Sequence, residues 1–320
     1  MRRKRVTAAL GVAAMCAPGT FVRTDIPERL PCEIAVERVA GPSATAAPGW
    51  SLAGVWRYSD ETREFGGFSA LLALEDGRLR AFSDRGSRFT FVEPGTDAPQ
   101  PEGTPFTRQA VERGYADDLW DIESTTRDPA TGRYWLGFEA VHAIHRYTPA
   151  SEPDGVRLLI NEVDWSDNEG AEAMLRLSDG RFMVVPEGGD TGLLYPSDPV
   201  DGASPARFAV RRPASGYAAT DLAQLPDGRV LLLMRNTVVA LPPFASLLAL
   251  GPPPRAGEVW APEVVLDLNR AIPRENYEGL AVREMADGRV AVWIISDDNL
   301  SVMQRTLLAR LVFDPARAGE

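Results

Sequence analysis

Five short turns with one shared pattern recur along the chain, and they constrain the fold more than any other feature. They are Asp76-Gly77-Arg78, Thr131-Gly132-Arg133, Asp179-Gly180-Arg181, Asp227-Gly228-Arg229 and Asp287-Gly288-Arg289. Their glycines are 55, 48, 48 and 60 residues apart. Asp-Gly favours tight hairpins because glycine, and to a lesser degree aspartate, adopts positive φ at little cost. Each turn therefore predicts a β-hairpin.

The segments that follow these turns have the composition of strands. They are apolar, β-branched or aromatic runs at residues 79–82, 134–138, 182–185, 230–233 and 290–295. No long amphipathic helix pattern separates the units, which disfavours a βαβ array. A regularly repeated strand-turn-strand unit is typical of a β-propeller with one unit per blade. The sequence predicts an all-β propeller with antiparallel sheets around a central channel.

The number of blades is open at this point. Five repeats are visible, but a degenerate sixth blade could lie in residues 98–117 or 242–260. Residues 33–39 and 306–313 are both strand-like, so a strand from one end of the chain could complete a blade formed by the other. We expect five or six blades and one propeller domain over residues 32–320.

The amino-terminal residues differ in composition from the rest of the chain. A basic start, Arg2 to Arg5, precedes an apolar run that ends at Pro18-Gly19, which is the layout of a secretory signal. The run is shorter than the ~20 residues that a membrane-spanning helix needs. A disordered basic tail is the alternative. We expect residues 1–31 to be signal-like or disordered, and the mature domain to be periplasmic or secreted without membrane insertion.

Charge and cysteine content narrow the classes of partner. The formal net charge is −11, from 45 acidic and 34 basic residues, so the chain should not bind nucleic acid phosphates. Cys16 lies inside the apolar run and leaves Cys32 alone, so no disulfide framework is expected. Nothing in the pattern calls for a partner chain, and we expect a monomer that binds a small molecule.

Aligning the five units on their turn glycine reveals a chemical repeat. Seven residues after the glycine come Asp84, Glu139, Glu187 and Arg235, and Asp297 comes nine after it. Seven to ten residues before the glycine come Ser69, Glu123, Glu172, Asp221 and Glu278. Eight of these ten positions are carboxylates, although 45 acids among 320 residues predict only about one or two. Because innermost strands line the channel of a propeller, we expect these side chains to form a ring around its axis.

A ring of carboxylates indicates a cation. Converging carboxylates raise one another's pKa unless a positive charge intervenes, and Ca²⁺ accepts oxygen ligands in flexible geometry. Zinc and copper are poor candidates because the chain has two histidines and no usable cysteine pair. The expected metal ligands are, in order of preference, Glu123, Glu172, Glu278 and Asp297, then Asp84 and Asp221. The alternative is that these acids only cap turns or pair with arginines.

Other charged residues adjoin this set. Asp121 stands two residues before Glu123 and should share its strand face. Arg235 occupies the one position after the turn glycines that lacks a carboxylate, where its guanidinium could bind substrate oxygens or form an internal ion pair. For Arg85 and Arg305 the ion pair is favoured. Glu139, Glu187 and Arg235 are the candidate catalytic residues, with one unligated carboxylate as the general base.

Several short motifs resemble the bacterial phytase-like family described as having esterase-like activity. They are Phe65-Gly66-Gly67-Phe68-Ser69-Ala70-Leu71, Ser83-Asp84-Arg85-Gly86, Asp121-Ile122-Glu123, Asn168-Glu169-Gly170-Ala171-Glu172-Ala173, Glu278-Gly279-Leu280-Ala281, Ser296-Asp297-Asp298-Asn299 and Gln304-Arg305-Thr306-Leu307-Leu308. The resemblance implies a secreted or periplasmic propeller related in architecture to calcium-dependent alkaline phytases. The only lysine is Lys4, so arginine would supply every phosphate contact.

The sequence supports three hypotheses of function. The first is a metal-assisted hydrolase of a phosphate or carboxylate ester, with Ca²⁺ held by the central acids. The second is a calcium-dependent lactonase that uses the same channel. The third is a non-catalytic envelope protein whose propeller is a binding platform, because one fold of this type serves many functions.

Overall fold

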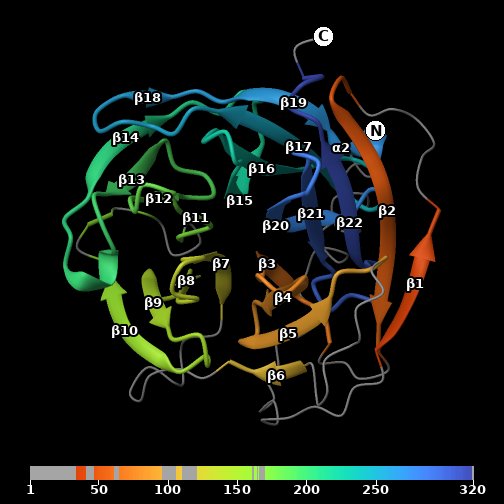
Figure 1. Ribbon diagram of the computed structural model, residues 1–320, viewed down its shortest axis with the longest axis horizontal. Helices are drawn as coiled ribbons and strands as arrows, with labels where there is room; N and C mark the ends of the chain where they lie inside the picture. The colour runs from red at the N-terminus through yellow and green to blue at the C-terminus, as the bar shows by residue number, and fades with distance from the viewer. Residues whose placement is uncertain are drawn as a thin grey trace, which may run out of the picture.

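The computed structural model of the 320-residue chain describes residues 34–40, 47–60, 65–95, 106–109, 121–160, 162–163, 165 and 170–318. In this part of the chain, five sheets stand around a common centre, with strands β3, β7, β11, β15 and β20 innermost (Figure 1). Neighbouring innermost strands contact one another around the whole circle. The predicted all-β propeller is confirmed, with five blades.

Each of the first four blades contains four strands that follow one another in space from the centre outward. The first blade is β3 (Phe68–Ala73), β4 (Arg78–Ser83), β5 (Ser87–Val92) and β6 (Phe106–Arg108). The second is β7 (Ile122–Arg127), β8 (Tyr134–Phe138), β9 (Ala143–Tyr147) and β10 (Pro153–Leu158). The third is β11 (Ala173–Arg176), β12 (Phe182–Val185), β13 (Thr191–Tyr195) and β14 (Ala206–Val210), and the fourth is β15 (Ala218–Gln224), β16 (Val230–Thr237), β17 (Phe244–Gly251) and β19 (Glu263–Asp267).

The fifth blade joins the two ends of the chain. It consists of β20 (Asn276–Glu284), β21 (Val290–Asp297) and β22 (Thr306–Phe313), followed outward by β2 (Trp50–Ser59) and β1 (Ala35–Val39). Strand β2 pairs antiparallel with β22 from Trp50↔Phe313 to Tyr58↔Thr306. This pairing closes the ring as the two strand-like ends predicted.

Neither region considered for a sixth blade forms one in the described residues. Residues 242–260 contain β17 of the fourth blade and β18 (Val259–Trp260), which adds to the third blade by parallel pairing with β14. Within 98–117, β6 is the outer strand of the first blade, and residues 98–105 and 110–117 lie outside the described residues. The predicted amino-terminal signal, residues 1–31, also lies outside them.

The repeated Asp-Gly-Arg turns connect the two innermost strands of a blade. In the fourth blade, the Gly228 amide donates to the Leu225 carbonyl at 2.9 Å, and Gly228 has a φ of 89°, which favours glycine. Asp227 accepts the Arg229 amide at 3.0 Å and its Nε at 2.9 Å. The aspartate of the repeat therefore caps the turn and holds the arginine side chain.

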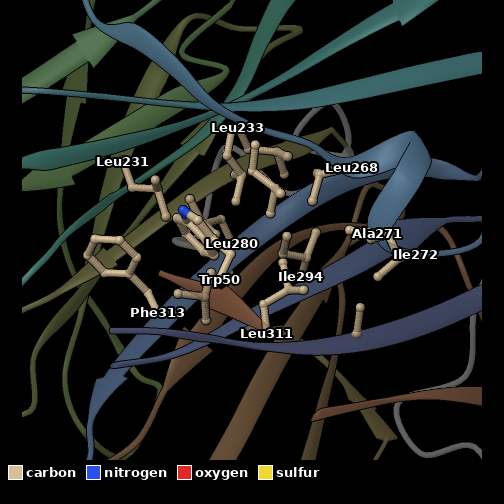
Figure 2. Close-up of a cluster of buried hydrophobic side chains, with 14 of the residues drawn as sticks. Trp50, Leu231, Leu233, Leu268, Ala271, Ile272, Leu280, Ile294, Leu311 and Phe313 are labelled. Atoms are coloured by element: carbon tan, nitrogen blue, oxygen red, sulfur yellow. The ribbon is translucent and has the colours of Figure 1, made fainter. Parts of the chain in front are cut away.

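The core lies between neighbouring blades. Figure 2 shows one such cluster, where Leu231 and Leu233 of β16 meet Leu280, Ile294 and Leu311 of the fifth blade. All five side chains are buried. The short helix α2 (Leu268–Ala271) covers the cluster, and the 3-10 helix η1 (Pro199–Asp201) follows β13. Among the described residues, no helix combines the length and the apolar character needed to cross a bilayer.

The innermost strands are irregular at one equivalent place. The pairing register shifts at Ser69 in β3, Glu123 in β7, Thr220 in β15 and Glu278 in β20. Each shift is a β-bulge, which bends the strand and turns one side chain in a new direction. Strand β11 begins directly after the corresponding residue, Glu172. This place in each blade is where the candidate functional residues begin.

Candidate functional site

Strand pairing defines two tiers of five equivalent residues. The A tier consists of the residues at the bulge or its equivalent: Ser69, Glu123, Glu172, Thr220 and Glu278. The B tier lies near the ends of the second strands: Asp84, Glu139, Glu187, Arg235 and Asp297. The B tier is the set expected from the sequence. Asp297 follows its turn glycine by two residues more because six residue pairs, and not four as in the other blades, separate the bulge position from the turn.

Asp221 does not belong to the A tier, and its prediction as the ring residue of the fourth blade is wrong by one position. The bulge falls on Thr220, so Asp221 is equivalent to Ala70 and Gly279, which follow the bulges. Because strand side chains alternate between faces, a shift of one residue changes what a side chain meets. The Asp221 carboxylate accepts the amides of Leu222 at 2.8 Å and Leu280 at 2.6 Å. It ties the fourth blade to the fifth.

The residues two positions before the A tier are polar in two blades, glycine in two others and Ala218 in the fourth. Asp121 and Asn276 take this place in the second and fifth blades, whereas Gly67 and Gly170 take it in the first and third. A Cβ on Gly67 would lie 2.4 Å from Asp84 Oδ1, and one on Gly170 would lie 2.5 Å from the Glu139 Cα. The glycines therefore leave space for B-tier acids.

Three carboxylates form a compact group at the second blade. Oxygens of Asp121, Glu123 and Glu139 all lie within 4.8 Å of one another. Asp121 has a φ of 142°, a backbone conformation that residues other than glycine rarely adopt, and its carbonyl accepts the Glu139 amide at 3.0 Å. The strained backbone helps to bring three negative charges together.

The acids of different blades interact at the centre. Burial raises the pKa of Glu123 well above its usual range, and the charges of Glu172, Asp121 and Glu278 raise it further. Burial likewise raises the pKa of Glu172, with additional contributions from Glu139, Glu187 and Glu278. Glutamates from the second, third and fifth blades therefore share one acidic centre.

The remaining two B-tier acids join the same centre. Burial raises the pKa of Asp84 to about 7, and the Asp121 charge acts in the same direction. Burial also raises the pKa of Asp297 well above its usual range, and Glu278 and Asp84 raise it further. The acidic centre comprises Asp84, Asp121, Glu123, Glu139, Glu172, Glu187, Glu278 and Asp297.

Arg235 is the one cation of the B tier and bridges two blades. Its Nη1 donates to Glu278 Oε1 and to Asn276 Oδ1, both at 2.7 Å, and its Nη2 donates to Glu187 Oε1 at 3.0 Å. Three of five guanidinium hydrogens are thus used. The Nε hydrogen and one Nη2 hydrogen have no hydrogen-bond partner among the described residues.

Asn276 is a site residue that the sequence did not single out. Its side chain donates to Glu278 Oε1 at 2.7 Å and to Asp297 Oδ2 at 3.5 Å while it accepts from Arg235. A signal was present, since Asn276-Tyr277-Glu278 repeats the spacing of Asp121-Ile122-Glu123. Arg305 forms an ion pair as expected, since its Nε donates to Glu275 Oε1 at 2.6 Å. The charge of Arg85 lowers the pKa of Asp84, against the larger effect of burial.

The residues of the acidic centre fit a hard divalent cation. Two ligands on opposite sides of Ca²⁺ stand ~4.6–5.2 Å apart, given Ca–O distances of ~2.3–2.6 Å, and the Asp121, Glu123 and Glu139 oxygens lie within 4.8 Å. Ser69, the A-tier residue of the first blade, is 1% exposed and its hydroxyl has no hydrogen-bond partner in the described part of the chain. An all-oxygen donor set with a buried, unsatisfied hydroxyl matches Ca²⁺ and does not match zinc.

The raised carboxyl pKa values predict how the metal-free protein responds to pH. Those of Asp84 and Glu139 rise from 3.8 and 4.5 to about 7, so the folded state binds more protons than the unfolded state between these values. Stability should therefore fall as the pH rises through this window. Urea unfolding in EDTA at pH 5 and pH 8 measures this. Equal or greater stability at pH 8 would contradict the prediction.

Comparisons with solved structures give several distant likenesses in backbone shape. A PQQ-bound aldose sugar dehydrogenase from Streptomyces coelicolor has a TM-score of 0.45 at 11% identity, with 88% of this chain and 99% of that one covered. A virginiamycin B lyase from Staphylococcus aureus has a TM-score of 0.42 at 10% identity, with 88% and 100% covered. For the extracellular domain of a hybrid two-component system from B. thetaiotaomicron, the TM-score is 0.36 at 12% identity, and the aligned region covers 78% of this chain but 28% of that one.

Family comparison is more specific. Among curated proteins, no sequence matches this chain significantly. The family model of phytase-like proteins, described as "esterase-like activity of phytase", matches residues 63–300. That range contains both tiers, Arg235 and the Asp121 group. With a five-bladed propeller and a match over most of its length, the chain belongs to the phytase-like family.

Proposed function

We propose that this protein is a Ca²⁺-assisted hydrolase of phosphate or carboxylate esters. One observation supports the proposal above the others: carboxylates from all but one blade converge on one centre, and the remaining blade supplies Arg235 to the same tier. A structural role alone gives no reason for buried acids to gather where burial raises their pKa values. Family membership supports an esterase-like activity.

The proposed ligands differ at three residues from those inferred from the sequence. Asp121, Glu123 and Glu139 are the closest group, and Glu172, Glu278, Asp84 and Asp297 surround it. Glu139 is therefore a better candidate for a ligand than for a base, and Asp221 is a structural residue. A bound divalent cation would supply Lewis-acid polarisation of the ester oxygen and a lowered pKa of water.

Two residues of the chain, Glu187 and Arg235, are proposed as the general base and the substrate-binding group. Glu187 is 31% exposed at its side chain, whereas Glu278 is 10% exposed, so of the two acids that pair with Arg235, Glu187 is the more accessible to water and substrate. We assign it the role of general base, which removes a proton from the attacking water. The two unused hydrogens of Arg235 would bind an anionic oxygen of the ester, and its bonds to Glu187 and Glu278 fix its orientation.

Export to the periplasm or medium is a further proposal. It is supported by the basic residues Arg2 to Arg5 and the apolar run that follows them. Mass spectrometry of the native protein tests it: a mature amino terminus beyond residue 17 in the exported fraction supports export. A chain beginning at Met1 in the cytoplasm contradicts it.

A substrate panel with and without metal tests the enzymatic proposal. The purified protein is given carboxylate esters, phosphomonoesters and lactones in Ca²⁺ and in EDTA. We expect hydrolysis of at least one ester class that requires Ca²⁺ and is lost in EDTA. Lactone hydrolysis alone would favour the lactonase hypothesis, and no turnover in any arm would favour a non-catalytic binding platform.

A further inference from the structure

A cavity of about 670 Å³ opens beside the acidic centre, between the third and fourth blades. One wall is the loop 186–190 after β12, and the other is the segment 211–217 that leads from β14 into β15. Glu187 lines this cavity and also accepts the Arg235 hydrogen bond. The cavity and the acidic centre are therefore contiguous, and a molecule bound at one can extend into the other.

Arg212 supports the loop 186–190, which forms one wall of the cavity. Its guanidinium donates to the carbonyl oxygens of four successive residues, Pro186, Glu187, Gly188 and Gly189, at distances of 3.1, 2.9, 3.0 and 2.8 Å. The Glu187 carbonyl also accepts the Ala219 amide at 3.2 Å. These contacts hold the loop in one conformation before any ligand binds, as expected of a preformed binding cavity.

The charges that line the cavity are compensated with one exception. Glu187 forms an ion pair with Arg235. Arg212 donates hydrogen bonds to the loop carbonyls and forms an ion pair with Asp190 at 3.4 Å. Arg211 also lines the cavity and is exposed, and its guanidinium has no hydrogen-bond or ion-pair partner among the described residues. The cavity therefore presents one cation that is free to meet a ligand.

We propose that this cavity holds the part of the ester that carries a second, anionic group, a carboxylate or a phosphate, and that Arg211 selects it. The inference rests on the proposed function, because the scissile ester lies at the acidic centre. A planar guanidinium matches both anions with two parallel hydrogen bonds. Since the protein carries a net charge of −11, a cation at this place also offsets the repulsion of an anionic ester.

Three phenyl esters with similar acyl chains test the selection. Phenyl hydrogen succinate carries a carboxylate, phenyl 3-phosphonopropionate carries a phosphate-like group, and phenyl butyrate carries no charge. We expect the wild type to favour at least one anionic ester over the butyrate in kcat/KM, and Arg211→Ala to lower that ratio about tenfold, mainly through KM. The anionic ester with the higher kcat/KM shows whether the cavity prefers a carboxylate or a phosphate.

The control is Arg270→Ala, which removes an arginine that is 82% exposed and lies outside the cavity. It should leave the ratio unchanged. Filling the cavity through Ser215→Trp should lower kcat/KM for the anionic esters, as removing Arg211 does. An equal ratio in wild type and Arg211→Ala would overturn the role of Arg211 while hydrolysis itself still supports the proposed function.

Binding without turnover separates the two proposals if no ester is hydrolysed. Succinate and 3-phosphonopropionate are titrated by calorimetry into the wild type and Arg211→Ala. Binding of either anion that weakens about tenfold in the variant supports the anion cavity even where hydrolysis fails. Absence of binding by both anions, or equal binding in both proteins, overturns it.

Discussion

Replacing Arg235 with methionine is expected to destabilise the metal-free protein by about 3 kcal/mol at pH 8. The guanidinium bonds to Glu278 at 2.7 Å and to Glu187 at 3.0 Å, and the Glu278 side chain is 10% exposed. Methionine retains the packing volume but leaves these charges uncompensated beside Glu172. Removing one partner of a poorly hydrated pair costs more than the pair itself contributes.

The stability lost in Arg235→Met should depend on pH and on the presence of Ca²⁺. Burial raises the pKa of Glu278, so lowering the pH protonates the unpaired acids and should reduce the effect of Arg235→Met. Ca²⁺ should restore part of the lost stability. Arg289→Met is a matched control, since its ion pair with Asp287 is 43% and 49% exposed and should contribute little to stability. Urea unfolding that gives equal losses for the two variants would contradict a compensating role for Arg235.

Replacing Glu172 with glutamine should act in opposite directions on metal-free and metal-bound protein. Glu172 is 8% exposed and faces Glu139, Glu187 and Glu278, so loss of its charge relieves repulsion and should not destabilise the protein in EDTA. It also removes a negative charge from the proposed cation site, and Ca²⁺ affinity should fall at least ~10-fold, with hydrolysis falling in parallel. Calorimetric titration of Ca²⁺ measures the first effect.

Two comparison variants make this result specific. Glu263→Gln changes an exposed residue of β19 and should alter neither stability nor Ca²⁺ affinity. Asp221→Asn should lose ~1–3 kcal/mol, because its carboxylate accepts two buried amides, but should keep its Ca²⁺ response. If Glu172→Gln instead behaves like Asp221→Asn, Glu172 has a structural role.

The sequence predicted those parts of the fold and site that depend on local pattern. Asp-Gly-Arg marks the hairpins because turn chemistry is local, and counting from each glycine locates Asp84, Glu139, Glu187, Arg235 and Asp297. The count before each turn was looser, because its window of seven to ten residues admits several positions. In the fourth blade the bulge falls on Thr220, eight residues before Gly228, and not on Asp221.

Other features depend on contacts between distant segments. The compact group at Asp121 requires a positive φ and the approach of Glu139 across the hairpin, neither of which follows from composition. The cavity requires Arg212 to fold back over loop 186–190, more than twenty residues away in sequence. Counting along the sequence identifies most residues of the centre, and the tertiary structure shows how close to one another their side chains lie.

Thermal unfolding of the wild-type protein across a series of Ca²⁺ concentrations tests the central claim most directly. If the acidic centre binds Ca²⁺ in the native state alone, the free energy of unfolding should rise by RT ln(1 + [L]/Kd), or ~2.7 kcal/mol at one hundred times Kd, and the Tm should rise with it. Glu172→Gln should need at least ~10-fold more Ca²⁺ for the same rise. A Tm that does not change with Ca²⁺ in either protein would contradict a cation site at the centre of this propeller.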